Sequence, residues 1–463
     1  MVRGIRLWLV LLFVTVFTGG GSILYLSHAA EESHGPAANE FPALSGTMSG
    51  DYANLAVNIV EHSVFSRSTT TPFTPDAWRT PGYPVFLAPF YALFGNFFPV
   101  LIAQVGILFL TVLLIFQMAT RFMSRRWALA LSILYLVLPT TTLAVASLLT
   151  ETLFVFCFIL ALYLCFFSEW KHMYVRWTLA GLLLAAAAYI RPASLYILPF
   201  FLFGYFVLYL PWSTISRKHI IAAGLLSIMF VAGLFPWCYR NKQLFDQFSF
   251  ASTGAFVLFR QFATAFYETY NDIPNLEARY ILLERAGLPP GPVPGDFASA
   301  ESLKKVAVEV ITEHPFSYAF FHATTFIPFF TSSGAQNYWF FAQTLRPDFN
   351  PAPEPSLIQA IHPFSWTKLT VVLENHGWTL LENAFWGAIS LLMLVGLWYS
   401  KDRRLAWMFL TLIFYFALVT GPMAHARYRM PVEPLILMIA FSGVAFLSEN
   451  RVRLISRVVK TGS

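Results

Sequence analysis

Two acidic residues stand beside long apolar runs of this chain. Asp51 opens a short segment of mixed polarity, and Glu151 follows Thr150 within the apolar stretch 148–158. A charged side chain at membrane depth is costly, so it must face a polar cavity or a partner and is a functional candidate. Such carboxylates could serve as a general base or bind a divalent cation, Mg²⁺ or Mn²⁺. For Asp51, spacing alone also permits a helix N-cap.

Arginines recur at the ends of the apolar runs. Arg79 stands in a turn formed by Pro81, Gly82 and Pro84, which would fix its backbone at the start of an apolar run. A single arginine of this kind is often a headgroup anchor, but several together would bind an anionic lipid head through bidentate phosphate contacts. The other candidates at the same level are Arg191, Arg240, Arg427 and Arg429, with Tyr83, His425 and Tyr428 as additional site residues.

The composition places these residues in a membrane protein. Hydrophobic residues make up 57% of the 463 residues and charged residues 12%, whereas a soluble domain carries about 25% charged residues. The basic residues are scattered, which excludes a nucleic-acid surface. The three cysteines form no C-x-x-C pair and no disulfide framework. We therefore expect an all-α polytopic membrane protein.

Apolar runs of membrane-spanning length predict about ten transmembrane helices, or twelve if the aromatic segment 316–341 is a helical hairpin rather than an interfacial helix. The first run could be a signal peptide, but it is long and rich in Phe, so we predict an uncleaved helix. The predicted spans are 7–27, 85–120, 127–146, 149–167, 178–198, 195–210, 220–237, 383–400, 405–421 and 431–448.

Charge in the connecting loops predicts the orientation. If the N-terminus is cytoplasmic, the inner loops and the tail contain 16 of the 30 Lys and Arg residues and three of the 24 acids. Positive charge concentrates on the cytoplasmic side of membrane proteins, so both termini are expected inside. The candidate acids and arginines then lie on the extracytoplasmic face.

This topology divides the chain into three regions. Residues 1–245 would form a transmembrane core whose first outer loop spans 28–84 and contains an amphipathic helix starting at Asp51. Residues 246–382 would form an outer-face region with interfacial helices. Residues 383–463 would supply the last transmembrane helices and a cytoplasmic tail.

Several strings resemble the C-type glycosyltransferases, in particular the family-39-like bacterial enzymes related to protein O-mannosyltransferases and aminoarabinose transferases. They are DYANLAVNIVE (51–61), WRTPGYPVFLAPFYALFG (78–95), TETLF (150–154), LAGLLLAAAAYIRP (179–192), PWCYRNKQLF (236–245) and ARYRMPVEPL (426–435). Thr80 departs from the family, which usually has a second Pro there, and the region 246–382 matches nothing in it.

The resemblance implies a function. Enzymes of this family take a sugar from a polyprenyl-phosphate carrier and pass it to a lipid, glycan or protein acceptor outside the cytoplasm. Apart from the resemblance, the absence of an endoplasmic-reticulum retention signal and the short outer loops favour the bacterial inner membrane. The resemblance also implies that Asp51 is the catalytic base, that Glu151 supports the site or a divalent ion, and that Arg79 lies near the donor phosphate. A single displacement assisted by one base would invert the anomeric configuration.

Two other functions remain open at this stage. A lipid-linked sugar flippase would also bind an anionic lipid, but it needs polar residues through the membrane and broken helices in both halves. A non-catalytic scaffold would not require acids and arginines at one level.

Overall fold

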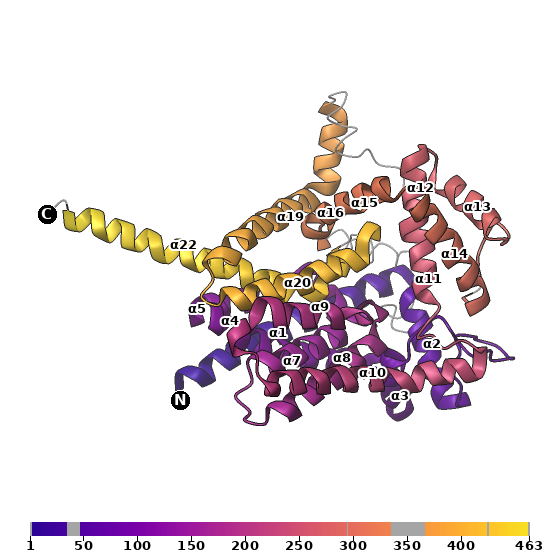
Figure 1. The fold of residues 1–463 in the computed structure, drawn as a ribbon, viewed down its shortest axis with the longest axis horizontal. Coiled ribbons are helices and arrows are strands. Elements are labelled where there is room, and N and C mark those ends of the chain that lie inside the picture. The colour runs from indigo at the N-terminus through magenta and orange to yellow at the C-terminus, as the bar shows by residue number, and fades with distance from the viewer. Residues whose placement is uncertain (1, 35–46, 294, 335–365, 424–425, 462–463) are drawn as a thin grey trace.

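The computed structural model describes residues 2–34, 47–293, 295–334, 366–423 and 426–461. Within these ranges every regular element is helical and no strand occurs, which confirms the expected all-α class (Figure 1). The elements up to the third quarter of the chain are α1 (Val2–His34), α2 (Thr47–His62), α3 (Gly82–Phe94), α4 (Phe98–Phe122), α5 (Arg125–Val137), α6 (Pro139–Val145), α7 (Glu151–Phe166), α8 (Met173–Ile190), η2 (Pro192–Ser194), α9 (Ile197–Phe203), η3 (Gly204–Tyr209), η4 (Trp212–Thr214), α10 (Arg217–Phe245), α11 (Thr253–Val257), η5 (Leu258–Ala263), α12 (Thr264–Asn271), α13 (Asn275–Arg285), α14 (Phe297–Glu313), α15 (Pro315–Thr324) and α16 (Phe326–Thr331). The remainder are α19 (Trp366–Tyr399), α20 (Arg403–Thr420), η6 (Gly421–Met423), α21 (Ala426–Arg429), η7 (Met430–Val432) and α22 (Glu433–Thr461).

The long helices are apolar enough for a multi-pass membrane protein. Eight segments of the described chain have the length and composition to cross a bilayer, and a bent pair of helices adds a ninth. The eight segments are Leu7–Tyr25, Phe98–Phe122, Met173–Ile190, Pro192–Tyr209, Arg217–Phe245, Thr379–Tyr399, Arg403–Met423 and Ala426–Ser448. The shorter helix α7 covers the remaining predicted span.

One predicted span is divided in two. The apolar run 85–120 was expected to be continuous, but α3 ends at Phe94 and α4 begins at Phe98. Gly95 adopts a left-handed conformation (φ 69°) and its N–H bonds back to the carbonyl of Tyr91. Glycine takes this conformation without steric cost, so it ends α3 here.

A second break lies in the bent pair α5 and α6. The two helices meet at an angle of 59° at Pro139. Proline lacks the N–H that would continue the helical ladder, but it suits the first position of the next helix. The bend lets α6 lead into the turn that carries Thr150 and Glu151.

Glycines allow the closest helix pairs to form. α8 packs along α10 and α19 packs along α22. A Cβ atom on Gly181 would lie 2.3 Å from the carbonyl oxygen of Leu226, and one on Gly396 would lie 1.8 Å from that of Ile439. Only a residue without a side chain permits this approach, as is typical of membrane helix interfaces.

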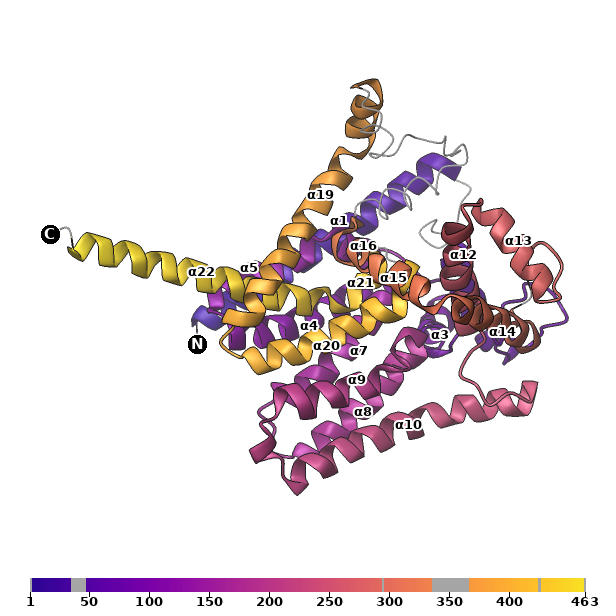
Figure 2. The ribbon, with the colours of Figure 1, turned by 45° about the horizontal axis from the view of Figure 1, so that its top comes forward.

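A second group of helices, α11 to α14, gathers at one end of the molecule, where α10 also ends (Figures 1 and 2). α12, α13 and α14 share a small core that includes Phe266, Leu282, Leu303 and Val310. α15 and α16 follow as two short helices of ten and six residues. The predicted interfacial segment 316–341 is thus helical as far as Thr331, and its part after residue 334 lies outside the described residues.

Candidate active site

Asp51 and Arg79 form a salt bridge at the surface of this end of the molecule. Arg79 donates to Asp51 Oδ2 from its Nε at 3.2 Å and from a terminal nitrogen at 2.8 Å. The guanidinium lies 5.0 Å from the ring centre of Tyr52, in a cation–π contact. Asp51 remains 28% exposed, and none of the described residues donates a hydrogen bond to its Oδ1 atom.

Asp51 is not a helix cap. α2 begins at Thr47, so Asp51 is its fifth residue and the N-cap interpretation is wrong for the structure. The predicted amphipathic helix is present, with Leu55 and Ala56 buried on one face and Glu61 exposed. The carboxylate therefore points to Arg79 rather than to its own helix end.

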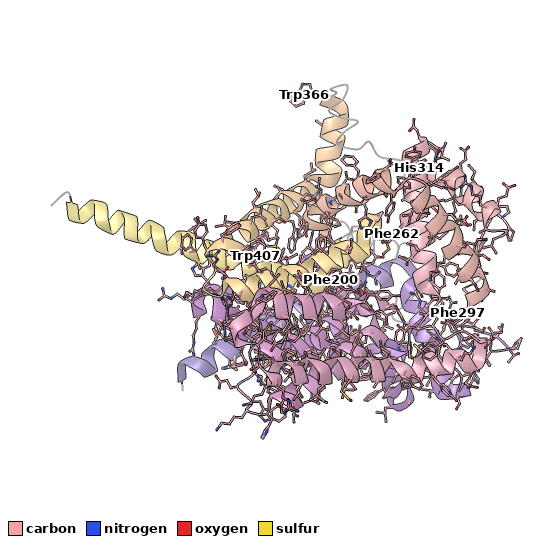
Figure 3. The ribbon with its side chains drawn as sticks, viewed as in Figure 1. Phe200, Phe262, Phe297, His314, Trp366 and Trp407 are labelled. Atoms are coloured by element: carbon pink, nitrogen blue, oxygen red, sulfur yellow. The ribbon has the colours of Figure 1, made fainter. Side chains whose placement is uncertain are left out.

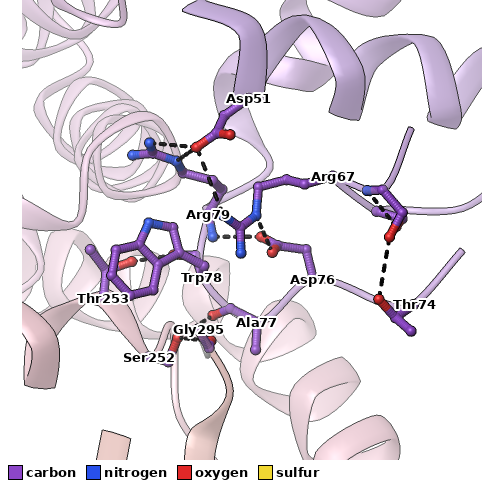
Figure 4. A network of polar contacts seen from close by, with 12 residues as sticks. Asp51, Arg67, Thr74, Asp76, Ala77, Trp78, Arg79, Ser252, Thr253 and Gly295 are labelled. Atoms are coloured by element: carbon purple, nitrogen blue, oxygen red, sulfur yellow. Dashed lines mark hydrogen bonds and ion pairs between the residues drawn. The ribbon is translucent and has the colours of Figure 1, made fainter. Parts of the chain in front are cut away.

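A second aspartate supports this salt bridge (Figure 4). Asp76 accepts the backbone N–H of Arg79 at Oδ2, at 2.7 Å, and the Nε of Arg67 at Oδ1, at 2.6 Å. A terminal nitrogen of Arg67 lies 3.8 Å from Asp51 Oδ2. Asp76 and Arg67 were not among the residues predicted from the sequence, because charged residues in a polar loop cannot be told apart there from solvated ones.

Glu151 lies in a second cluster and is 1% exposed. Its Oε1 atom pairs with Arg191 at 2.9 Å and with the Nε of Arg427, while Thr150 donates to Oε2. The three charged residues come from α7, from the end of α8 and from α21. One carboxylate and two guanidiniums leave the cluster with a formal charge of +1, which suits an anionic ligand.

Two tyrosines lie between the clusters. Tyr52 follows Asp51 in α2, and its ring meets that of Tyr83 edge to face, with centroids 5.3 Å apart. Tyr83 is buried and donates to Gln104, whose amide in turn donates to the carbonyls of Val145 and Ser147 just before Glu151. A continuous set of contacts thus joins the loop of α2 and α3 to the start of α7.

The other predicted site residues take different places. Arg240 donates to the backbone carbonyl of Asp76 at 2.9 Å and lies among Phe65, Trp237 and Phe245. Tyr428 lies 5.8 Å from Arg191. His425 lies outside the described residues.

Arg429 is fully buried in a third network. It donates to Glu433 and to the carbonyls of Phe329 and Ser332, and it lies 3.7 Å from the ring centre of Trp386. None of these partners belongs to the clusters of Asp51 or Glu151. The structure therefore places Arg429 where it fastens α16 to α21 and α22.

The described side chains form no group that could hold a divalent metal. Among the described residues, no three His, Cys, Asp or Glu side chains gather in a group. Asp51 pairs with Arg79, whereas Glu151 pairs with Arg191 and Arg427. Among the described contacts, no arginine pairs with both carboxylates. We therefore assign no metal ligands and use no metal in the mechanism.

Part of the chain that contributes to this site matches a family of known proteins. Residues 78–237 match the family described as dolichyl-phosphate-mannose-protein mannosyltransferase. The resemblance to the C-type glycosyltransferases is confirmed for this segment. The mannosyltransferase-like segment contains Arg79, Glu151 and Arg191, whereas Asp51 and Arg427 lie outside it. Among curated proteins, none matches the chain.

Three solved structures are similar over most of the chain. The oligosaccharyltransferase AglB from Archaeoglobus fulgidus, in complex with an inhibitory peptide and a dolichol-phosphate, is 14% identical with a TM-score of 0.49, and the match covers 99% of this chain and 52% of that one. A second Archaeoglobus fulgidus oligosaccharyltransferase structure is 12% identical with a TM-score of 0.42, at 96% and 52% coverage. ArnT from Cupriavidus metallidurans is 12% identical with a TM-score of 0.37, at 93% and 76% coverage. The chain thus spans about half the length of the oligosaccharyltransferases.

Proposed function

We propose that this protein is a membrane glycosyltransferase that moves a sugar from a polyprenyl-phosphate carrier to a lipid, glycan or protein acceptor. The observation that carries this proposal is a pair of carboxylate–arginine clusters, one at Asp51 and one at Glu151, that are joined through the contacts of Tyr52 and Tyr83. The match of residues 78–237 to a mannosyltransferase family supports it.

In the proposed reaction Asp51 is the base. Its Oδ1 atom accepts the proton of the acceptor nucleophile, while Oδ2 stays paired with Arg79. The nucleophile attacks the anomeric carbon, the bond from that carbon to the phosphate oxygen breaks, and the phosphate leaves with the electron pair. One displacement inverts the anomeric configuration, so a product that retains configuration would contradict this mechanism.

The arginines stabilise the leaving phosphate. Arg79, Arg191 and Arg427 keep 21%, 12% and 24% of their side-chain surfaces accessible. Fixed positive charge in a site of low dielectric stabilises developing negative charge better than water does. Glu151 keeps Arg191 and Arg427 together against their mutual repulsion.

An apolar cavity of about 1120 Å³ offers a place for the carrier's hydrocarbon tail. It lies between α9, α16, α19 and α20, and Phe200 and Trp407 line it (Figure 3). The hydroxyls of Ser390 and Thr411 in its wall already donate to backbone carbonyls, so only hydrocarbon fits without an unpaired polar group.

The same helices lead to the phosphate-binding arginines. α9 follows Arg191 after the turn η2, and α20 leads through η6 toward Arg427. Tyr415 of α20 donates to the carbonyl of Ala193, which fastens α20 to that turn. A carrier with its phosphate on the arginines could therefore extend its tail between α9 and α20.

The proposed location is the bacterial inner membrane, with both termini cytoplasmic and the active site on the extracytoplasmic face. The basic loops support this orientation, because Arg121 and Asp402, from two predicted inner loops, pair at 3.1 Å. The reaction would then serve the cell envelope.

An assay with a polyprenyl-phosphate carrying a labelled sugar, in proteoliposomes, separates the three candidate functions. A transferase releases the carrier phosphate and labels an acceptor, a flippase moves the carrier without breaking it, and a scaffold does neither. We expect Asp51→Asn to reduce turnover by about 10²–10⁴-fold, the usual contribution of a general base. Turnover that survives in a folded Asp51→Asn protein would remove the proposed base.

A further inference from the structure

The loop that carries Arg79 contains a buried carboxylate with two distinct tasks. Asp76 is 4% exposed at its side chain, and each of its oxygens has one partner: Oδ1 accepts Arg67 Nε at 2.6 Å, and Oδ2 accepts the backbone N–H of Arg79 at 2.7 Å. One oxygen therefore fixes the arginine that pairs with Asp51, and the other holds a second arginine aside.

The second arginine is close enough to compete for Asp51. A terminal nitrogen of Arg67 lies 3.8 Å from Asp51 Oδ2, beyond hydrogen-bond distance, whereas Arg79 reaches the same oxygen at 2.8 Å. A released Arg67 would move to the remaining oxygen, because a carboxylate accepts arginine on both oxygens in a bidentate pair. Asp51 Oδ1 would then no longer accept a proton.

The backbone of this loop is held from the other side. Ser252 donates from its backbone N–H and its hydroxyl to the carbonyl of Ala77, and Thr253 donates to that of Trp78 (Figure 4). Arg240 donates a hydrogen bond to the backbone carbonyl of Asp76. With three successive carbonyls bound, the loop is fixed and the Arg67 side chain is the part that can move.

We propose that Asp76 is a positioning residue that keeps Arg67 away from Asp51 Oδ1 and so leaves Asp51 able to act as base. This inference rests on the proposed function. In this proposal the first outer loop contains two arginines with different roles: Arg79 orients the base, and Arg67 must be kept away from it.

The first experiment uses Asp76→Asn in the labelled-carrier assay. The Asn side-chain oxygen can still accept the backbone N–H of Arg79, but the NH₂ group then faces the Nε of Arg67. Because both of these groups are hydrogen-bond donors, the contact is lost and Arg67 is released. We expect kcat to fall by about tenfold or more, with the donor KM changed by less than about twofold, because the loss is in proton transfer.

A double variant separates restraint of Arg67 from general damage to the loop. Adding Arg67→Gln to Asp76→Asn removes the competing arginine, so we expect most of the lost kcat to return. A double variant as slow as Asp76→Asn would overturn the proposal. Asp402→Asn is the matched control, because Asp402 makes the same two kinds of contact outside the site. It accepts a hydrogen bond from the Nε of Arg121 and another from the backbone N–H of Leu405, three residues later. This control variant should leave kcat unchanged.

A second readout does not depend on turnover. A thermal-unfolding double-mutant cycle between Asp51→Asn and Arg67→Gln measures their coupling. The coupling should be small in the wild-type background and clearly larger with Asp76→Asn, where Arg67 reaches Asp51. An equal coupling in both backgrounds would overturn the inference even if the protein is a transferase, and an increase without any turnover would refute only the proposed function.

Discussion

Glu151 illustrates at the residue scale how a buried charge is tolerated. Its carboxylate is almost inaccessible, yet it contacts two guanidiniums and a hydroxyl, so no charge in the cluster lacks a partner. Removing one charged partner of such a cluster lowers the free energy of unfolding by more than the intact cluster contributes to it, because the remaining charges stay buried without a counter-charge.

We therefore expect Glu151→Gln to destabilise the protein by about 3–5 kcal/mol, because Arg191 and Arg427 lose their counter-charge. Thermal unfolding in detergent would measure this. Glu169→Gln, at an exposed position in the chain, is the control and should unfold at the wild-type temperature. A Glu151→Gln protein as stable as this control would mean that the arginines have other partners.

Arg79 is held at three points: its backbone by Asp76, its guanidinium by Asp51 and its cationic face by Tyr52. We expect Arg79→Ala to weaken binding of the polyprenyl-phosphate donor by about tenfold or more, the loss typical of one charge-assisted contact. Equilibrium binding of a labelled carrier tests this. An unchanged donor affinity would remove Arg79 from the phosphate site.

At the scale of elements, glycines let the helices next to Arg191 and Arg427 pack closely on their neighbours. Arg191 follows α8, which packs on α10, and Arg427 precedes α22, which packs on α19. These two helix pairs therefore help to set the backbone position of each arginine. The glycines in these interfaces let backbone touch backbone, which sets the helix separation more tightly than flexible side chains would.

Gly396→Ala should separate α19 from α22, because the new methyl group would overlap the carbonyl of Ile439. We expect a loss of about 1–3 kcal/mol in the free energy of unfolding, the usual cost of overpacking. Gly106→Ala in α4 is the control, since its Cβ would meet no atom within 4 Å. Equal melting temperatures for the two variants would show that the α19–α22 interface can relax.

At the scale of the whole molecule, the cavity between α9 and α20 is walled in part by three segments that are long and apolar enough to cross a membrane, Pro192–Tyr209, Thr379–Tyr399 and Arg403–Met423. Its wall combines segments that are distant in the chain, from Pro199 to Phe414. If it holds the carrier's tail, as we propose, donor affinity must depend on tail length, since each buried methylene contributes about 0.8 kcal/mol.

Gly387→Trp would fill this cavity without a backbone clash, because Gly387 lines it and a Cβ there meets no atom within 4 Å. We expect the KM for a long-chain carrier to rise several-fold, with a smaller change for a short-chain analogue. Gly106→Trp, an equally open position elsewhere, should leave both KM values unchanged. A rise that does not depend on tail length would place the tail elsewhere.

The amino-acid sequence alone determined the helical class and most of the long apolar helices, because apolar length is a local property of the chain. It predicted that the acids and arginines form one site, which stays a prediction, and it also allowed Asp51 a role as a helix cap. Only the position of Asp51 in the interior of α2 removed that alternative.

The tertiary structure decided which charges pair. Glu151 meets Arg427 across a separation of 276 residues, while Arg429, two positions later, turns to Glu433 and a buried network. Asp76 came to light only through its contacts, since a loop aspartate has no periodicity to mark it. Pairing depends on the angle at which each side chain leaves its helix and on the packing between helices, and neither is encoded in the local pattern of residues.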